Sequence, residues 1–236
     1  MNLYQGWQVI VQSFKTLYER IGLVMGTNLL WFFIGFGPAL IVLYIPYQHP
    51  VLFIAGMLVT VLTLGASAAA VNYVMIKIIN RDEVGLRDFK EGFRRFFGRG
   101  ALAAVIAILG TLILWVDLLF SLNHSNQIIQ LMSGIWIWGL VFWYAVLQFV
   151  FPFLVQQDIG LIKALKRAAL VVIDNLLGSA IVVVVTLVVL VLCIVLAAPL
   201  LLFVASLLAL IQNYAYNQIL QKYDKAEKEA EAEAEV

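Results

Sequence analysis

The sequence predicts an all-α, polytopic membrane protein with six transmembrane helices and three in-plane amphipathic helices. Three observations lead to this fold class. The chain of 236 residues is 64% hydrophobic and 12% charged, whereas about a quarter of the residues in a typical soluble domain are charged. Apolar runs of the length that a membrane span needs, about 20 residues, recur along the chain. The 15 Lys and Arg residues fall into a few short segments between these runs.

The placement of these basic residues orients every predicted span. Lys and Arg occur near the start of the chain and at 77–99, 163–167 and 222–228, while the connections on the other side carry none. Cytoplasmic loops of membrane proteins are enriched in Lys and Arg. We therefore expect both termini and the segments 77–99 and 158–178 to be cytoplasmic.

The first third of the chain predicts a surface helix followed by two spans. Residues 3–20 place apolar side chains at helical spacing and polar side chains off that stripe, which is typical of a helix that lies in the membrane surface. The spans are expected at about 21–45 and 51–76, joined by an outer turn. The small residues at 65–70 would let another helix approach the second span closely.

The segment 77–99 is the element around which the other spans are arranged, because it contains seven of the fifteen basic residues. Read as a helix, it has an apolar face that is expected to be buried at the cytoplasmic interface. This face consists of Leu86, Phe89, Phe93, Phe96 and Phe97. The other face consists of Arg87, Asp88, Lys90, Glu91, Arg94 and Arg95. Its basic residues Arg87, Lys90, Arg94 and Arg95 are expected to meet lipid headgroups or water.

The rest of the chain repeats this order of a surface helix and two spans. A third amphipathic helix is expected within 158–178. Pro199 would disrupt a continuous helix, so the last apolar run is divided there. The four remaining spans are then about 101–120, 128–155, 179–197 and 200–220. The result is a six-span domain at 1–221 and a charged tail at 222–236.

The threefold rhythm leaves two interpretations open. Gly6, Gly85 and Gly160 occupy comparable places in the three units, as internal duplication would produce. Sparse residue matches elsewhere are equally compatible with a simple alternation of hydropathy.

Three ionisable residues are candidates for chemistry. Asp117 is an acid inside a predicted span, where carboxylates often handle ions or protons, although it is close to the outer end. His49 and His124 fall in the outer turns, so with Asp117 they offer three ligands for a metal or a proton. They lack the spacing of a helical metal site. We predict no metal site, no cofactor and no catalytic centre, since the common nucleotide, zinc and hydrolase motifs do not occur.

Polar side chains in the spans are expected to hold the helices together. Such groups normally form hydrogen bonds between neighbouring helices, so packing is preferred over a substrate pocket. They are Asn28, Asn72, Gln148, Gln212, Asn213 and Asn217. Gly22 and Gly26 would bring the first span close to a neighbour, in the same chain or in a second copy.

Residues 62–100, LTLGASAAAVNYVMIKIINRDEVGLRDFKEGFRRFFGRG, resemble the YesL-like family of bacterial integral membrane proteins. In that family a span of small residues leads to a basic loop with a recurring Asp-Phe and a later Phe. The segment Asn28-Leu29-Leu30-Trp31 and residues 151–178 are similar as well. The positions carried over are Asn28, Trp31, Asp88, Phe89 and Phe93. The resemblance implies a bacterial cell (inner) membrane and an accessory role near carbohydrate uptake, and the family's own activity is unknown.

These observations favour a non-enzymatic membrane protein that assists a transport system or forms part of one. A self-sufficient small-solute transporter is the first alternative and would need broken helices near the midplane, for which Pro38 with Gly35 and Gly37 is a loose candidate. A membrane-embedded enzyme is the second. The expected partners are a bilayer that contains anionic lipids and other transport subunits or a second copy. Nucleic acid is not expected.

Overall fold

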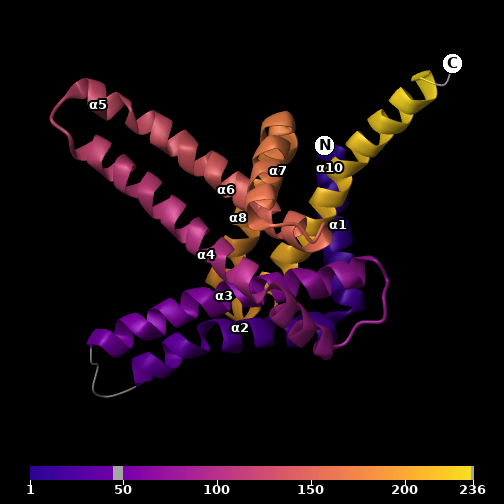
Figure 1. The fold of residues 1–236 in the computed structure, drawn as a ribbon, viewed down its shortest axis with the longest axis horizontal. Helices are drawn as coiled ribbons and strands as arrows, with labels where there is room; N and C mark the ends of the chain where they lie inside the picture. Colours follow the sequence, from indigo (N-terminus) through magenta and orange to yellow (C-terminus); the bar gives the residue numbers. More distant parts are fainter. Residues whose placement is uncertain (45–49, 235–236) are drawn as a thin grey trace.

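The computed structural model describes residues 1–44 and 50–234, with side chains to residue 223. All regular elements in this part of the chain are helices. They are α1 (Leu3–Glu19), α2 (Ile21–Tyr44), α3 (Pro50–Ile79), α4 (Leu86–Asn123), α5 (Gln127–Leu131), α6 (Ser133–Gln156), α7 (Leu161–Asp174), α8 (Leu176–Leu196), α9 (Ala198–Leu202) and α10 (Val204–Ala234). Helices α2 and α3 form one arm, and α4 and α6 form a second arm with α5 at its tip (Figure 1). The expected turn after α2 falls at 45–49, outside the described residues.

Five segments within the described residues are long and apolar enough to cross a membrane. They are Ile21–Tyr44, Pro50–Ile79, Leu86–Asn123, Gln127–Gln156 and Leu176–Leu196. These helices agree with the prediction of a helical membrane protein.

The sixth predicted span has a different structure from the one expected at 200–220. It is divided at Phe203 between the short helix α9 and the long helix α10. Polar residues such as Gln212 and Asn213 interrupt the apolar sequence of α10. This helix is therefore less apolar than the five helices that could cross a membrane. Helix α10 contacts α1, α2, α3, α6 and α8. Helix α10 thus lies within the bundle, and its polar side chains meet protein neighbours on several sides.

The predicted surface helix at 77–99 is not a separate element. Residues 77–79 complete α3, residues 80–85 form a turn, and α4 continues without a break from Leu86 through the predicted third span to Asn123. A helix of 38 residues is roughly 57 Å long. The chain changes direction before the basic residues of α4 and not after them.

The three predicted units are therefore not equivalent. In the first and third units a break at Arg20 or Asn175 separates the surface helix from the following helix, whereas α4 has none. Gly85 and Gly160 precede the first residues of α4 and α7, but Gly6 lies inside α1.

Helices α3 and α4 cross in close contact at two glycines. The small residues expected to face other helices are buried, and Ala66, Ala69 and Ala70 are fully inaccessible. A Cβ atom on Gly65 would lie 2.3 Å from the carbonyl oxygen of Gly100, and a Cβ atom on Gly100 would lie 2.7 Å from that of Gly65. Real Cβ atoms essentially never come within 3.0 Å of another heavy atom, so this crossing requires both glycines.

Helices α1 and α7 each have two apolar faces. Each packs small or compact side chains on the other helices and leaves large apolar side chains exposed. The buried residues are Gly6, Val9 and Ser13 of α1, and Leu161, Ala164, Ala168, Val171 and Val172 of α7. The exposed ones include Leu3, Trp7 and Phe14 of α1, and Ile162, Leu170 and Ile173 of α7. The exposed residues of α1, Leu3, Trp7 and Phe14, belong to the apolar stripe that was predicted at 3–20.

The predicted tail at 222–236 begins within a helix. Helix α10 continues to Ala234 and projects away from the other helices at the upper right of the view (Figure 1).

Candidate functional site at the basic end of the helices

The turn between α3 and α4 is held by Asp88. Its Oδ1 atom accepts a hydrogen bond from the Lys77 ammonium at 2.5 Å, and its Oδ2 atom accepts one from the amide of Gly85 at 2.8 Å. The carboxylate therefore joins the last turn of α3 to the first turn of α4. Its negative charge also interacts favourably with the positive N-terminal end of the α4 dipole. Asp88 was predicted to lie on the polar face of the surface helix. Only 15% of its side chain is exposed, because both oxygens bind within the protein.

Arg81 occupies an unusual backbone position in the same turn. Its φ angle is 61°, in the left-handed region that glycine usually occupies at the end of a helix. The amide of Arg81 donates to the carbonyl of Ile78, and the amide of Asp82 donates to that of Lys77. These two hydrogen bonds close the end of α3. An arginine in place of glycine costs about 1–2 kcal/mol in this conformation, and such strain is concentrated at functional sites.

The aromatic face of α4 is only partly buried. Phe89 and Phe96 are 2% and 1% exposed, and Phe93 is half-buried against Phe89. Phe97 is 41% exposed, so it does not pack on the other helices, and its burial at the cytoplasmic interface stays a prediction. Consecutive residues of a helix point about 100° apart. Phe96 and Phe97 consequently cannot both pack on α3.

Arg95 and Arg99 of α4 converge on Asp158, in the turn between α6 and α7. The Arg95 Nη2 atom lies 2.5 Å from one carboxylate oxygen, and the Arg99 Nη2 atom lies 2.7 Å from the other. Hydrogen bonds from Arg95 and then Arg99 hold the pKa of Asp158 below its ordinary value. Arg95 keeps an exposed side chain and also links α4 to the start of α7. Arg87, Lys90 and Arg94 are exposed.

We expect this attachment to weaken in acid. A lowered carboxyl pKa stabilises the folded state above the unfolded-state value, about 3.9, and this contribution is lost as pH falls through the folded-state pKa. Asp158→Asn should lower the melting temperature in detergent at pH 7 and have a much smaller effect near pH 3. About 1 kcal/mol is the expected size, because solvent reaches these side chains. Asp117→Asn is the control, and an equal pH dependence in both variants would contradict the assignment.

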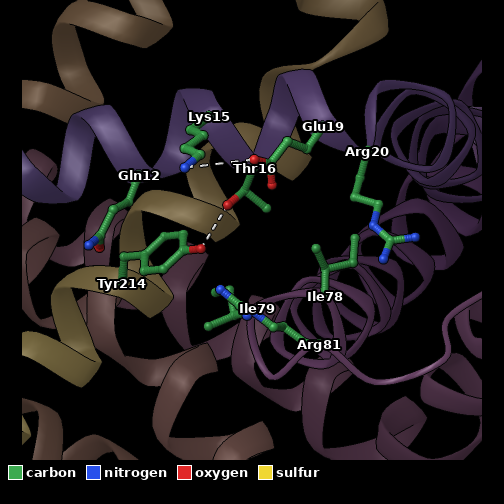
Figure 2. A pocket seen from close by; sticks show the side chains of 9 residues that line it. All are labelled: Gln12, Lys15, Thr16, Glu19, Arg20, Ile78, Ile79, Arg81 and Tyr214. Carbon is green, nitrogen blue, oxygen red and sulfur yellow. Dashed lines mark hydrogen bonds and ion pairs between the residues drawn. The ribbon is translucent and has the colours of Figure 1, made fainter.

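A polar cavity of about 480 Å³ lies between α1, the end of α3 and α10. Figure 2 shows its lining side chains around a common space. They are Gln12, Lys15, Thr16, Glu19, Arg20, Ile78, Ile79, Arg81 and Tyr214. The hydroxyl groups of Thr16 and Tyr214 lie 2.7 Å apart and join α1 to α10 across the cavity wall.

The lining carries more positive than negative charge. Lys15 and Glu19 form an ion pair at 3.9 Å with both side chains largely exposed, so each screens the other only weakly. Among the described side chains, no carboxylate lies within ion-pair distance of Arg20 or Arg81. The two guanidinium groups can therefore bind an anion.

The three ionisable candidates of the outer side do not form a site within the described residues. Asp117 is half-buried. The Nδ1 atom of His124 accepts from the amide of Asn126 at 3.0 Å, and its ring contacts Phe120, so this histidine shapes the turn after α4. His49 lies outside the described residues. No group of three metal-binding side chains occurs in the part of the chain that was searched.

Amide side chains between the helices bind one another. Asn213 of α10 donates to the Asn72 carbonyl oxygen of α3 at 2.8 Å and accepts from the Gln156 amide of α6 at 2.9 Å. Gln212 donates to Gln148 of α6 at 2.8 Å. These contacts join three helices and use amide groups that a substrate would otherwise bind.

Asn28 holds the break between α9 and α10. Its side-chain oxygen accepts from the amides of Ala205 and Ser206 at 2.8 and 3.3 Å, and its amide donates to the carbonyl of Leu201 at 2.6 Å. These are unpaired backbone groups of the helix ends. Asn28 of α2 therefore caps α10 from a distant part of the chain. Trp31, one turn further along, is half-buried with its ring edge-on to Phe36.

Sequence reasoning did not predict the cavity or its residues. Lys15 and Arg20 were recognised as polar residues of a surface helix, and Arg81 only as part of a basic segment. No sequence motif links them, because they come from α1 and from the turn after α3. The polar stripe of α10, with Tyr214 beside Gln212 and Asn213, was the available signal for a helix within the bundle.

Comparison with known proteins adds one finding. Residues 24–118 match a family model described as "Protein of unknown function, DUF624". No curated protein and no solved structure matches the chain. The matched segment covers most of α2, all of α3 and most of α4, so it contains the glycine crossing, Asn28 and Asp88. The match confirms that the chain is similar to an uncharacterised family. It does not confirm the YesL-like name of the resemblance noted above.

Proposed function

We propose that this protein is a non-enzymatic accessory protein or component of a transport system in a bacterial inner membrane. The observation that carries this proposal is the mutual pairing of the buried amides Asn72, Gln148 and Asn213 with the half-buried amides Gln156 and Gln212. A transporter that acts alone would need polar groups near the midplane that are free to bind a solute. Here the amides between the helices fasten the helices to each other. The YesL-like resemblance supports a connection to carbohydrate uptake.

The self-sufficient transporter remains the alternative. Pro38 lies inside α2 and cannot donate to the carbonyl one turn back, which is a feature of broken transporter helices. The nearby Gly35 carbonyl accepts a hydrogen bond from Thr63 of α3 at 3.0 Å, so this irregularity too is used in packing. An enzyme has weaker support, since Asp117 and His124 serve no common site among the described residues.

Solute uptake into proteoliposomes separates the first two functions. The purified protein alone should give no saturable uptake of sugars or sugar phosphates, whereas deletion in a bacterial host should slow uptake of a sugar by an intact transport system. Restoring the gene should restore that rate. Saturable uptake by the protein alone would support the self-sufficient transporter instead.

The proposed topology has six spans, with both termini and the basic turns in the cytoplasm. The distribution of Lys and Arg supports this orientation, and the position of α10 within the bundle explains how a sixth span tolerates polar residues. Helices α1 and α7 would lie in the membrane surface, because their exposed apolar faces suit the interface.

We expect an engineered cysteine at residue 48 or 124, in a chain with Cys193→Ser, to react with an impermeant thiol reagent only from the periplasmic side. A cysteine at residue 83 is the control and should react only from the cytoplasmic side. Labelling of residue 48 or 124 from the cytoplasm would contradict this orientation.

A further inference from the structure

We propose that the cavity between α1, α3 and α10 binds a phosphate group. Arginine binds phosphate through two parallel hydrogen bonds, and Arg20 and Arg81 both line this cavity without a carboxylate partner among the described residues. Lys15 adds a third cation. The Gln12 amide provides further donors, and so does whichever of the Thr16 and Tyr214 hydroxyl groups accepts the hydrogen bond between them. The volume of about 480 Å³ is within the usual range of small-ligand pockets.

The electrostatics favour an anion after the helix ends are included. Three cations and the Glu19 carboxylate give the lining a formal charge of +2. The C-termini of α1 and α3 lie here and each contributes about −0.5, while the N-terminus of α2 contributes about +0.5. A positive charge of roughly 1.5 remains. The positive charge of the lining is therefore larger than the negative charge of the helix ends, and the excess favours an anion.

The backbone of Arg81 is an independent observation for the same site. A glycine would close the end of α3 without strain, yet this position has an arginine with a φ angle of 61°. Figure 2 shows Arg81 among the cavity residues, across from Thr16 and Tyr214. An arginine at this strained position places a guanidinium group at the cavity wall, which a glycine could not do. This explains why arginine occurs where glycine would be less strained.

Two sources of the phosphate group share this chemistry, namely a dissolved phosphate compound and the headgroup of an anionic phospholipid. Two measurements on purified full-length protein in nanodiscs distinguish them. In phosphatidylcholine nanodiscs, inorganic phosphate is titrated at constant ionic strength and the melting temperature is recorded. In nanodiscs with added phosphatidylglycerol, native mass spectrometry counts the lipid molecules retained after release from the disc.

Arg20→Gln/Arg81→Gln should weaken phosphate binding by about tenfold per guanidinium or abolish lipid retention, since the charged contact of one exposed guanidinium is worth about one decade of affinity. Arg87→Gln/Arg94→Gln removes the same charge from exposed positions of α4 and should leave both readouts within about twofold. A response to phosphate alone identifies a dissolved ligand, and a response to phosphatidylglycerol alone identifies a headgroup.

Arg81→Gly keeps the test valid if the double variant folds poorly. Glycine suits the left-handed position, so this variant should melt at or above the temperature of the unchanged protein and still bind phosphate more weakly. Equal losses in the two double variants, or no binding in either measurement, would overturn the proposal. Because binding is measured on purified protein, that result would leave the transport proposal unaffected.

Discussion

Gly100→Ala should lower the melting temperature of the protein in detergent, although alanine is the better helix former by about 1 kcal/mol. The added Cβ atom would lie 2.7 Å from the Gly65 carbonyl oxygen and 3.1 Å from the Cα atom of Ala66. Both are backbone atoms of α3, so the helices must move apart. Overpacking of this kind costs about 1–3 kcal/mol, and each kcal/mol shifts the melting temperature by about 2–4 °C in a chain of this size.

Gly98→Ala is the matched control, two residues earlier in α4. A Cβ atom at Gly98 meets no atom within 4 Å, so this variant should melt at the same or a higher temperature because it gains helix propensity alone. Gly65→Ala tests the crossing from the α3 side and should be at least as destabilising, since its Cβ atom would lie 2.3 Å from the Gly100 carbonyl oxygen. If both alanine variants of the crossing melt like Gly98→Ala, the helices are not in close contact there.

The bounds of the apolar helices were largely predictable because bilayer-crossing helices need long apolar runs. The predicted spans at 21–45 and 51–76 correspond to α2 and α3. The small residues at 65–70 correctly indicated a close contact, since only small side chains let two backbones approach. The identity of the partner glycine, Gly100, was not predictable, because hydropathy contains no information on which helices are neighbours.

The failures occurred where tertiary contacts decide the structure. The surface helix expected at 77–99 was misplaced because helical periodicity is the same on both sides of a turn, and the left-handed residue that ends α3 is Arg81 and not a glycine. The inward position of Asp88 depends on Lys77, eleven residues earlier. The capping of α10 by Asn28 joins residues 177 positions apart, which no local pattern reports.

Asn213→Leu should destabilise the protein by about 2 kcal/mol. The change removes the hydrogen bonds to Asn72 and Gln156 and leaves both amides short of a partner in a buried region, which costs about 1–3 kcal/mol per group in soluble proteins and less in membranes. Asn72 is 4% exposed, so water cannot replace its lost partner, whereas Gln156 is half-buried and loses less.

Asn217→Leu is the matched control for this prediction, because it makes the same change one turn further along α10 at a half-buried position. The difference in melting temperature between the two variants measures the amide network alone, since side-chain volume and helix propensity change equally. A double variant, Asn72→Leu/Asn213→Leu, should recover part of the loss, because removing both partners leaves fewer unpaired groups than removing one. Equal melting temperatures for Asn213→Leu and Asn217→Leu would mean that the network does not stabilise the bundle. The buried amides would then be available to a solute, and the self-sufficient transporter would become the better proposal.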